Sequence, residues 1–273
     1  MTTCVLAARE GFQGPTTGEF FWPCVGPRLH VLGVELCVNR VVLLTLLAML
    51  GVLVFFLWAF RRPELVPRRK AQNVAEVGID FIRNSVVLEV IGRDGLRFLP
   101  YLTTLFFFIF AGNVLSVIPG INFPANSRSA VPAALAILSW LLFNYAGVKA
   151  QGLGPYLRNS LFPPGVPWPI YVLVTPIELV STFLVRPLTL TIRLTANMIA
   201  GHLILVVFLT GTAYMLEPLI RNGEPTITAL FAVGSFAFAI VLIGFEMFVA
   251  ALQAFIFTIL TATYIAGALE SEH

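Results

Sequence analysis

Two long apolar stretches near the C-terminus, residues 177–215 and 226–267, constrain the fold most strongly, because each is about 40 residues long. An α-helix of that length spans roughly 60 Å, about twice the hydrocarbon core of a bilayer. Both stretches are apolar almost throughout, so neither helix can extend half its length into water. We therefore predict two membrane helices that are strongly tilted, kinked or broken, joined as a hairpin by the polar turn at residues 217–225.

The rest of the sequence is also typical of a membrane protein. Charged residues make up 11% and hydrophobic residues 58% of the 273 positions, whereas soluble domains carry about 25% charged residues. The composition predicts an all-α polytopic membrane protein of about five membrane helices, with little left for a soluble catalytic domain. The apolar runs predict membrane helices at residues 41–60, 98–118, 131–148, 170–215 and 226–268, and an amphipathic interfacial helix at 71–95.

Local signals predict where these helices bend or stop. Pro187 and the Gly211-Thr212 step are candidate bends within the first long helix. Four prolines in residues 162–169 exclude regular helix there, and residues 149–158 form a polar stretch after the third span.

Basic residues indicate how the chain is oriented. Arg40 alone flanks the start of the first span, whereas five basic residues follow its end, at positions 61, 62, 68, 69 and 70. The positive-inside rule then predicts a cytoplasmic loop here, an extracytoplasmic segment 1–40 ahead of the membrane domain 41–273, and a cytoplasmic C-terminus. These basic residues lack interleaved aromatics, so they do not indicate nucleic-acid binding.

The N-terminal segment has the composition of neither a signal peptide nor a transit peptide, which favours a bacterial cell membrane over an organelle. It contains all three cysteines, Cys4, Cys24 and Cys37. Either a Cys24–Cys37 disulfide or free thiols fit this pattern.

An arginine in the middle of the first long helix is the main candidate functional residue. Arg193 lies between apolar sequences on both sides, where a charge costs about 2.5 kcal/mol or more. Because a guanidinium cannot lose its proton, Arg193 is expected to be a fixed positive barrier that blocks a continuous proton leak and attracts a partner carboxylate. The alternative, snorkelling to an interface, is stronger for Arg186, which precedes Pro187.

Helical spacing sorts the polar neighbours of Arg193. Arg186, Arg193 and Asn197 share one face of the first long helix, and His202 points to the opposite side. Three residues of the second long helix fall on one stripe: Glu246, Gln253 and Tyr264. Each buried imidazole or carboxylate alone could be a satisfied structural group, but together in facing helices they favour proton carriers.

The sequence contains no nucleophile–His–acid set, no cluster of metal ligands and no phosphate loop. We therefore expect no catalytic site, metal or cofactor in this chain.

Residues 186–202, RPLTLTIRLTANMIAGH, together with QAFIF at 253–257 and Tyr264, resemble the signature of subunit a of F-type ATP synthases. Weaker agreement at NVLSVIPG (113–120), Pro176-Ile-Glu178 and the tail 270–273 extends the resemblance over residues 75–273.

The resemblance implies a stator that lines two offset proton half-channels against a rotating ring of c subunits and couples proton flow to ATP synthesis. Its further partners would be b-type peripheral stalk subunits and the remainder of the complex. By motif position, Arg193 faces the ring and separates the half-channels, Asn197 sits beside it, and Gln253 lies near it on the second helix.

The resemblance also pairs His202 with Glu246 in the outer half-channel, an order that is exchanged in some members. It assigns Glu178 to the inner half-channel, although Glu178 precedes Arg186-Pro187 by one residue more than the family pattern. Because one residue turns a helix by about 100°, this shift changes the side of the helix on which Glu178 is expected to lie.

Other functions predict other features. An ion channel or transporter that uses Arg193 as an anion or proton-coupling site would be expected to show broken helices in repeated halves, and no internal repeat is visible. A structural scaffold would not need Arg193, His202 or Glu246. Sodium in place of protons remains open, because the family's ion choice lies mainly in the ring subunit.

Overall fold

The computed structural model of the chain describes residues 29–31, 34–36, 40–64, 69–118, 129–162, 170–222 and 227–269. Several predictions lie outside these residues: the conformation of most of segment 1–40, the Cys24–Cys37 disulfide, the proline-rich run before residue 170 and the tail 270–273.

The described chain is helical, with five helices long and apolar enough to cross a membrane: Val41–Ala59, Arg93–Val114, Ala130–Gln151, Leu173–Arg221 and Ile227–Leu269. This confirms the predicted all-α class and its five spans. Two short strands, β1 (Leu29–Val31) and β2 (Val34–Leu36), form an antiparallel pair that the sequence patterns did not predict.

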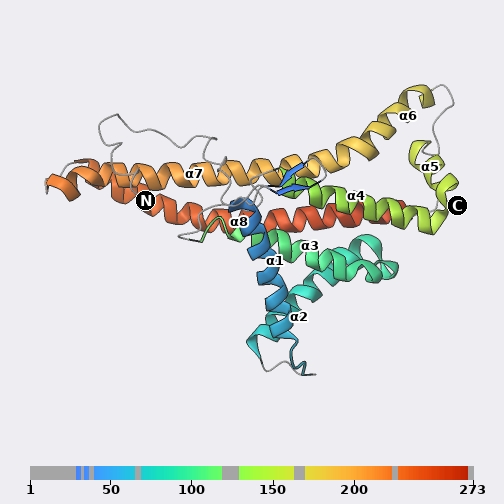
Figure 1. Cartoon of the computed structure of the whole chain (residues 1–273), viewed down its shortest axis with the longest axis horizontal. Coiled ribbons are helices and arrows are strands. Elements are labelled where there is room, and N and C mark those ends of the chain that lie inside the picture. The colour runs from blue at the N-terminus through green and yellow to red at the C-terminus, as the bar shows by residue number, and fades with distance from the viewer. Residues whose placement is uncertain are drawn as a thin grey trace.

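The two last helices form the long axis of the molecule. Helix α7 (Arg186–Asn222) runs side by side with α8 (Ile227–Leu269), and this is the most extensive contact between described helices. Helix α1 (Arg40–Ala59) crosses that axis (Figure 1). Since 20 residues of helix span about 30 Å, α1 fits a bilayer when roughly upright. The long pair is then strongly tilted, as its length requires.

The bend before α7 occurs at a π-helical turn. Helix α6 (Tyr171–Val180) continues through the π turn Ser181–Val185 into α7, and the path bends there (Figure 1). Pro187 has no N–H to donate and its ring crowds the preceding turn, which a wider π turn relieves.

The second candidate bend, at Gly211-Thr212, is uninterrupted α-helix. There the Thr212 hydroxyl donates to the Phe208 carbonyl at 2.7 Å and lies 3.0 Å from Ser235 Oγ of α8, which ties the two helices together. Helix α7 then continues to Asn222, past the predicted end at residue 215.

The predicted interfacial helix 71–95 is divided into three pieces. These are α2 (Lys70–Ile82), a π-helical segment η2 (Arg83–Ile91) and a 3-10 segment η3 (Arg93–Phe98), with Gly92 at φ 84° between the last two. A positive φ favours glycine because other residues have a Cβ clash there. Segment η2 packs against α8, and this packing explains why the helix is divided here.

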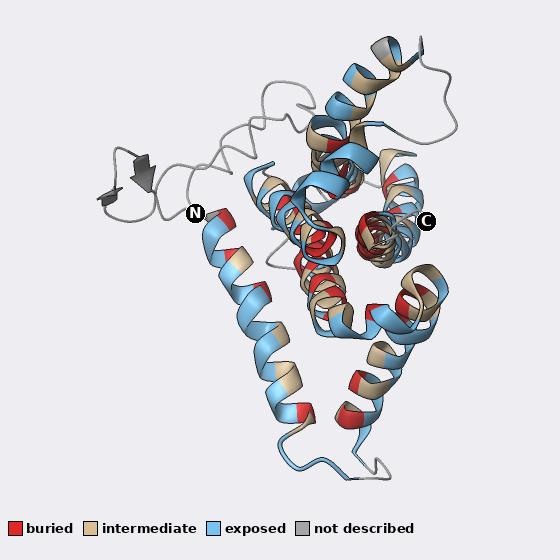
Figure 2. Ribbon diagram, turned by 90° about the vertical axis from the view of Figure 1, so that its right-hand side faces the viewer, coloured by how far each residue is buried: buried red, intermediate tan, exposed pale blue. Residues whose placement is uncertain are grey.

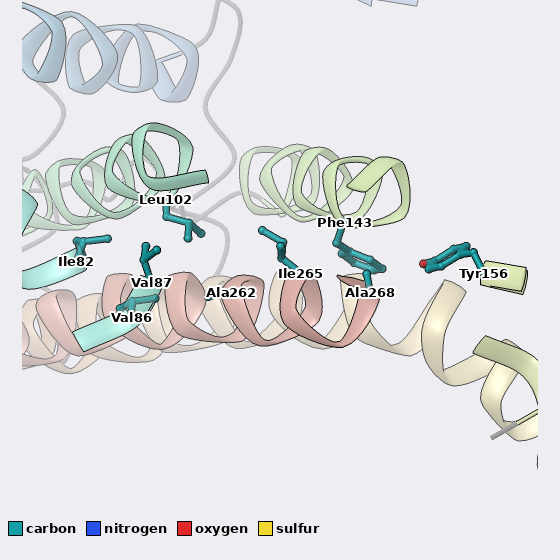
Figure 3. Close-up of a cluster of buried hydrophobic side chains, with 9 residues drawn as sticks. All are labelled: Ile82, Val86, Val87, Leu102, Phe143, Tyr156, Ala262, Ile265 and Ala268. Atoms are coloured by element: carbon teal, nitrogen blue, oxygen red, sulfur yellow. The ribbon is translucent and has the colours of Figure 1, made fainter. Parts of the chain in front are cut away.

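Helix α3 (Leu99–Val114) and helix α4 (Ala130–Gln151) pack along the long pair, and buried residues concentrate in this bundle whereas α1 is mostly exposed (Figure 2). One core cluster joins the end of α2, η2, α3, α4, the short helix α5 (Leu153–Leu161) and the end of α8 (Figure 3): Ile82, Val86, Val87, Leu102, Phe143, Tyr156, Ala262, Ile265 and Ala268.

A short helix, α5 (Leu153–Leu161), occupies part of the polar stretch 149–158, where no helix was predicted. Gly152, at φ 87°, separates it from α4. Tyr156 of α5 packs directly on Gly147, and its hydroxyl donates to Asn144 Oδ1 at 3.0 Å. Tertiary contacts therefore fold α5 back onto α4.

Candidate functional site

Arg193 lies on an outward face of α7. Leu190, Leu194 and Met198 are buried on the inner face of the helix, whereas Arg193 and Asn197 are exposed on the described chain. An exposed guanidinium in the middle of an apolar helix cannot face lipid without a large cost. This face of α7 therefore requires a polar or charged neighbour other than the residues that the structure describes.

His202 and Glu246 are buried inside the chain, at 4% and 5% exposure. The burial of His202 and the exposure of Arg193 agree with the different faces predicted from helical spacing. The pairing of the two side chains, His202 with Glu246, stays a prediction.

The Glu246 carboxylate lies where α3, α7 and α8 meet. Ser116, just after α3, donates from Oγ to Glu246 Oε1 at 3.1 Å. On the other side, a Cβ built on Gly201 of α7 would lie 3.4 Å from the same oxygen. The missing side chain at Gly201 thus leaves room for the carboxylate.

Ser116 can serve both protonation states of Glu246. Its Oγ is also 2.7 Å from the Asn113 carbonyl, but one hydroxyl proton makes only one strong donation at a time. Toward an ionised Glu246 the hydroxyl donates. Toward a protonated Glu246 it can accept the carboxyl proton while donating to Asn113.

A hollow of about 320 Å³ lies between α7 and α8 and connects the exposed and buried parts of the site. Its polar lining consists of Asn197, Glu246 and Gln253, with Gly201 among the apolar residues around them. Asn197 lies on the same outward face of α7 as Arg193, whereas Glu246 and Gln253 are buried. The hollow therefore brings together three of the predicted site residues from both helices.

A second polar group gathers near the start of α7. The Arg186 guanidinium lies over the Tyr264 ring of α8, 5.1 Å from its centroid. Burial raises the pKa of the Tyr156 hydroxyl, against smaller lowering effects of its hydrogen bond with Ser160 and the positive charge of Arg186. The structure thus brings Arg186 and Tyr264 together. Glu178 is half-buried on α6, before the π turn.

The sequence matches the family described as ATP synthase A chain over residues 42–266. The chain belongs to the ATP synthase A chain family. It is 45% identical to the ATP synthase subunit a of Frankia alni, over 98% of this chain and 90% of that protein. With the subunit a of Rhodococcus erythropolis it shares 42% identity, over 100% of this chain and 95% of that protein.

Membership of the A chain family confirms the resemblance inferred from the motifs and makes the chain a multi-pass membrane protein. The match begins at residue 42, ahead of the predicted start at residue 75.

The sequence analysis did not identify two residues of the site, Ser116 and Gly201. Both occur within the quoted motifs, yet neither is titratable, so a search for charged groups passes over them. Ser116 follows Asn113 by one helical turn in an otherwise apolar run, and this pair of polar residues is the signal that could have identified it. Among the residues that the structure describes, no three His, Cys, Asp or Glu side chains are grouped as metal ligands.

Proposed function

We propose that the chain is the proton-conducting stator of a rotary ATP synthase, in which two offset half-channels exchange protons with carboxylates on a rotating ring of c subunits. The observation that carries this proposal is the exposed Arg193–Asn197 face, which lies beside a hollow leading to the buried Glu246. The subunit itself catalyses nothing; it delivers and removes protons.

Arg193 acts as the barrier. A permanent positive charge on the ring-facing side repels excess protons and stabilises a passing carboxylate in its ionised form. Asn197, one turn further along the same exposed face, adds a neutral polar group beside it. A proton then cannot go straight past Arg193 and must travel with the ring.

The outer half-channel uses His202 and Glu246. Both are buried and polar, and an imidazole and a desolvated carboxylate can exchange protons near neutral pH. Ser116 supports the carboxylate in either protonation state. From Glu246 the hollow leads toward Asn197, where a ring carboxylate would receive the proton.

The inner half-channel uses residues around the start of α7. Glu178 supplies the acid there, and the contact between Arg186 and Tyr264 keeps a positive charge near the helix end. The partners are the c-ring, b-type peripheral stalk subunits and the remainder of the complex. The membrane is a bacterial cell membrane, with the N-terminus outside and the C-terminus in the cytoplasm.

A charge-swap experiment tests the outer half-channel. The double variant His202→Glu with Glu246→His keeps one imidazole and one carboxylate, so it should recover more ATP-driven proton pumping in inverted vesicles than either single variant. Glu246→Ala should reduce pumping strongly. A double variant no better than the worse single variant would disprove the pairing, and normal pumping in Glu246→Ala would disprove the carrier role.

A further inference from the structure

The corner between α1 and α2 carries a concentration of unneutralised positive charge. Arg61 and Arg62 follow α1, and Arg69 and Lys70 begin α2, and all four side chains are exposed. In the described part of the chain, none of these four basic residues forms an ion pair. These four cations outnumber the exposed Glu64 carboxylate at the same corner, so the surplus positive charge attracts anions from outside the chain.

A buried glutamine holds this corner together. Gln72 is 1% exposed. Its Nε2 donates to the Glu64 carbonyl at 2.8 Å, and its Oε1 accepts from the Glu64 backbone N–H at 3.3 Å. The same Nε2 lies 2.7 Å from Glu76 Oε1. These hydrogen bonds of Gln72 tie the chain after Arg61-Arg62 to the first turn of α2. They therefore keep the four basic residues at one corner.

Exposed apolar residues flank the basic corner on both helices. On α1, Trp58 is 62% exposed one turn before Arg62. On α2, Val74, Val77 and Phe81 are all exposed, and their spacing of three and four residues puts them on one face. Charges at the end of a span with an indole beside them, followed by an amphipathic helix with an apolar face, form the pattern of a membrane–water interface.

We propose that this corner, Arg61, Arg62, Arg69 and Lys70, binds the headgroups of anionic phospholipids. A lipid phosphodiester brings an anion to the depth at which α1 ends, and a guanidinium can bind its oxygens in a bidentate manner. The acyl chains of the same lipid cover Trp58 and the apolar face of α2. A lipid satisfies the charged and the apolar part of the surface together, which a soluble anion cannot do.

The site would anchor the protruding part of the chain. Helices α1 and α2 extend away from the α7–α8 pair (Figure 1). Lipid bound at their shared corner would fix its depth in the bilayer and hence the tilt of the long pair. This role is separate from proton conduction, because the corner contains none of the residues proposed for the half-channels.

The test is lipid selectivity of the purified complex containing this chain, reconstituted in phosphatidylcholine with a minor fraction of spin-labelled lipid. Phosphatidylglycerol should associate several-fold more than labelled phosphatidylcholine. The preference should fall in about 1 M NaCl, where the Debye length is about 3 Å. Arg61→Gln with Arg62→Gln should lower it several-fold, whereas Arg61→Lys with Arg62→Lys should retain most of it.

The matched control is Arg83→Gln with Arg93→Gln, which removes the same charge from exposed positions outside the corner. The proposal is overturned if this control lowers the preference as much as the Arg61/Arg62 variant does, or if wild-type complex shows no preference for phosphatidylglycerol. It is also overturned if millimolar inorganic phosphate abolishes the preference at constant ionic strength, because the corner would then be a site for a soluble anion.

Discussion

Side chains of increasing size at Gly201 test the Glu246 site, because the distances from this position to the Glu246 carboxylate are known. A Cβ at this position would lie 3.4 Å from Glu246 Oε1 and 3.6 Å from Cδ, which is ordinary contact. Gly201→Ala should therefore fit, and alanine gains about 0.5–1 kcal/mol over glycine inside a helix. A leucine carries three more heavy atoms toward the carboxylate, and overpacking of this kind costs about 1–3 kcal/mol.

The functional consequence of Gly201→Leu should exceed its cost in stability. Its side chain would enter the hollow of about 320 Å³ and push Glu246 away from the Ser116 hydroxyl. We expect ATP-driven proton pumping in inverted vesicles to be near normal for Gly201→Ala and mostly lost for Gly201→Leu. Thermal unfolding of the purified complex, measured in parallel, separates lost conduction from lost assembly.

Gly211 provides the matched control. It lies on the same helix, and a Cβ built there meets no atom of the chain within 4 Å. Gly211→Leu should pump much better than Gly201→Leu. If both leucine variants pump equally well, the carboxylate beside Gly201 does not carry protons.

Two further predictions concern hydroxyl groups. Ser116→Ala removes a hydrogen bond to Glu246 that is worth about 1.5–3 kcal/mol when the carboxylate is charged, so pumping should fall, while Ser116→Thr should retain it. Ser139→Ala, at an equally buried serine that bonds to the Tyr101 hydroxyl, should pump normally; an equal loss would contradict a specific role for Ser116. Burial raises the pKa of Tyr156, so its phenol is still neutral in the folded chain when an unfolded tyrosine ionises near pH 10. The contribution of Tyr156 to the packing of α5 is therefore fully present below pH 10 and is lost as the pH rises above it, through the raised pKa. Ultraviolet titration of wild type against Tyr156→Phe should show one late-ionising phenol, and identical titration curves would refute this.

The membrane helices were predictable because a bilayer leaves few choices. A backbone in hydrocarbon must satisfy its own hydrogen bonds, so each long apolar run has to be a helix. The division of residues 71–95 was not predictable from periodicity. It depends on packing of Val86 and Val87 against the end of α8, which lies far away in the sequence. Helix α5 was missed because its sequence is polar, and its position depends on the fit of Tyr156 over Gly147.

The site was predictable where one helix supplies the signal. Spacing along α7 puts Arg193 and His202 on different faces, and the structure exposes the first and buries the second. The hydrogen bond between Ser116 and Glu246 joins residues 130 positions apart. The periodicity of one helix does not show which residues of two distant helices meet, so this hydrogen bond is visible only in the structure.

The most direct test of the account is proton-driven ATP synthesis with Arg193→Gln. The substitution keeps a polar side chain, shorter than arginine, but removes the charge that we propose separates the two half-channels. Arg221→Gln is the control, since Arg221 is an exposed arginine near the other end of α7, paired with Glu217 at 3.1 Å. In inverted vesicles with normal amounts of assembled complex, we predict no ATP synthesis for Arg193→Gln and near-normal synthesis for Arg221→Gln. Normal synthesis by Arg193→Gln would contradict the central claim.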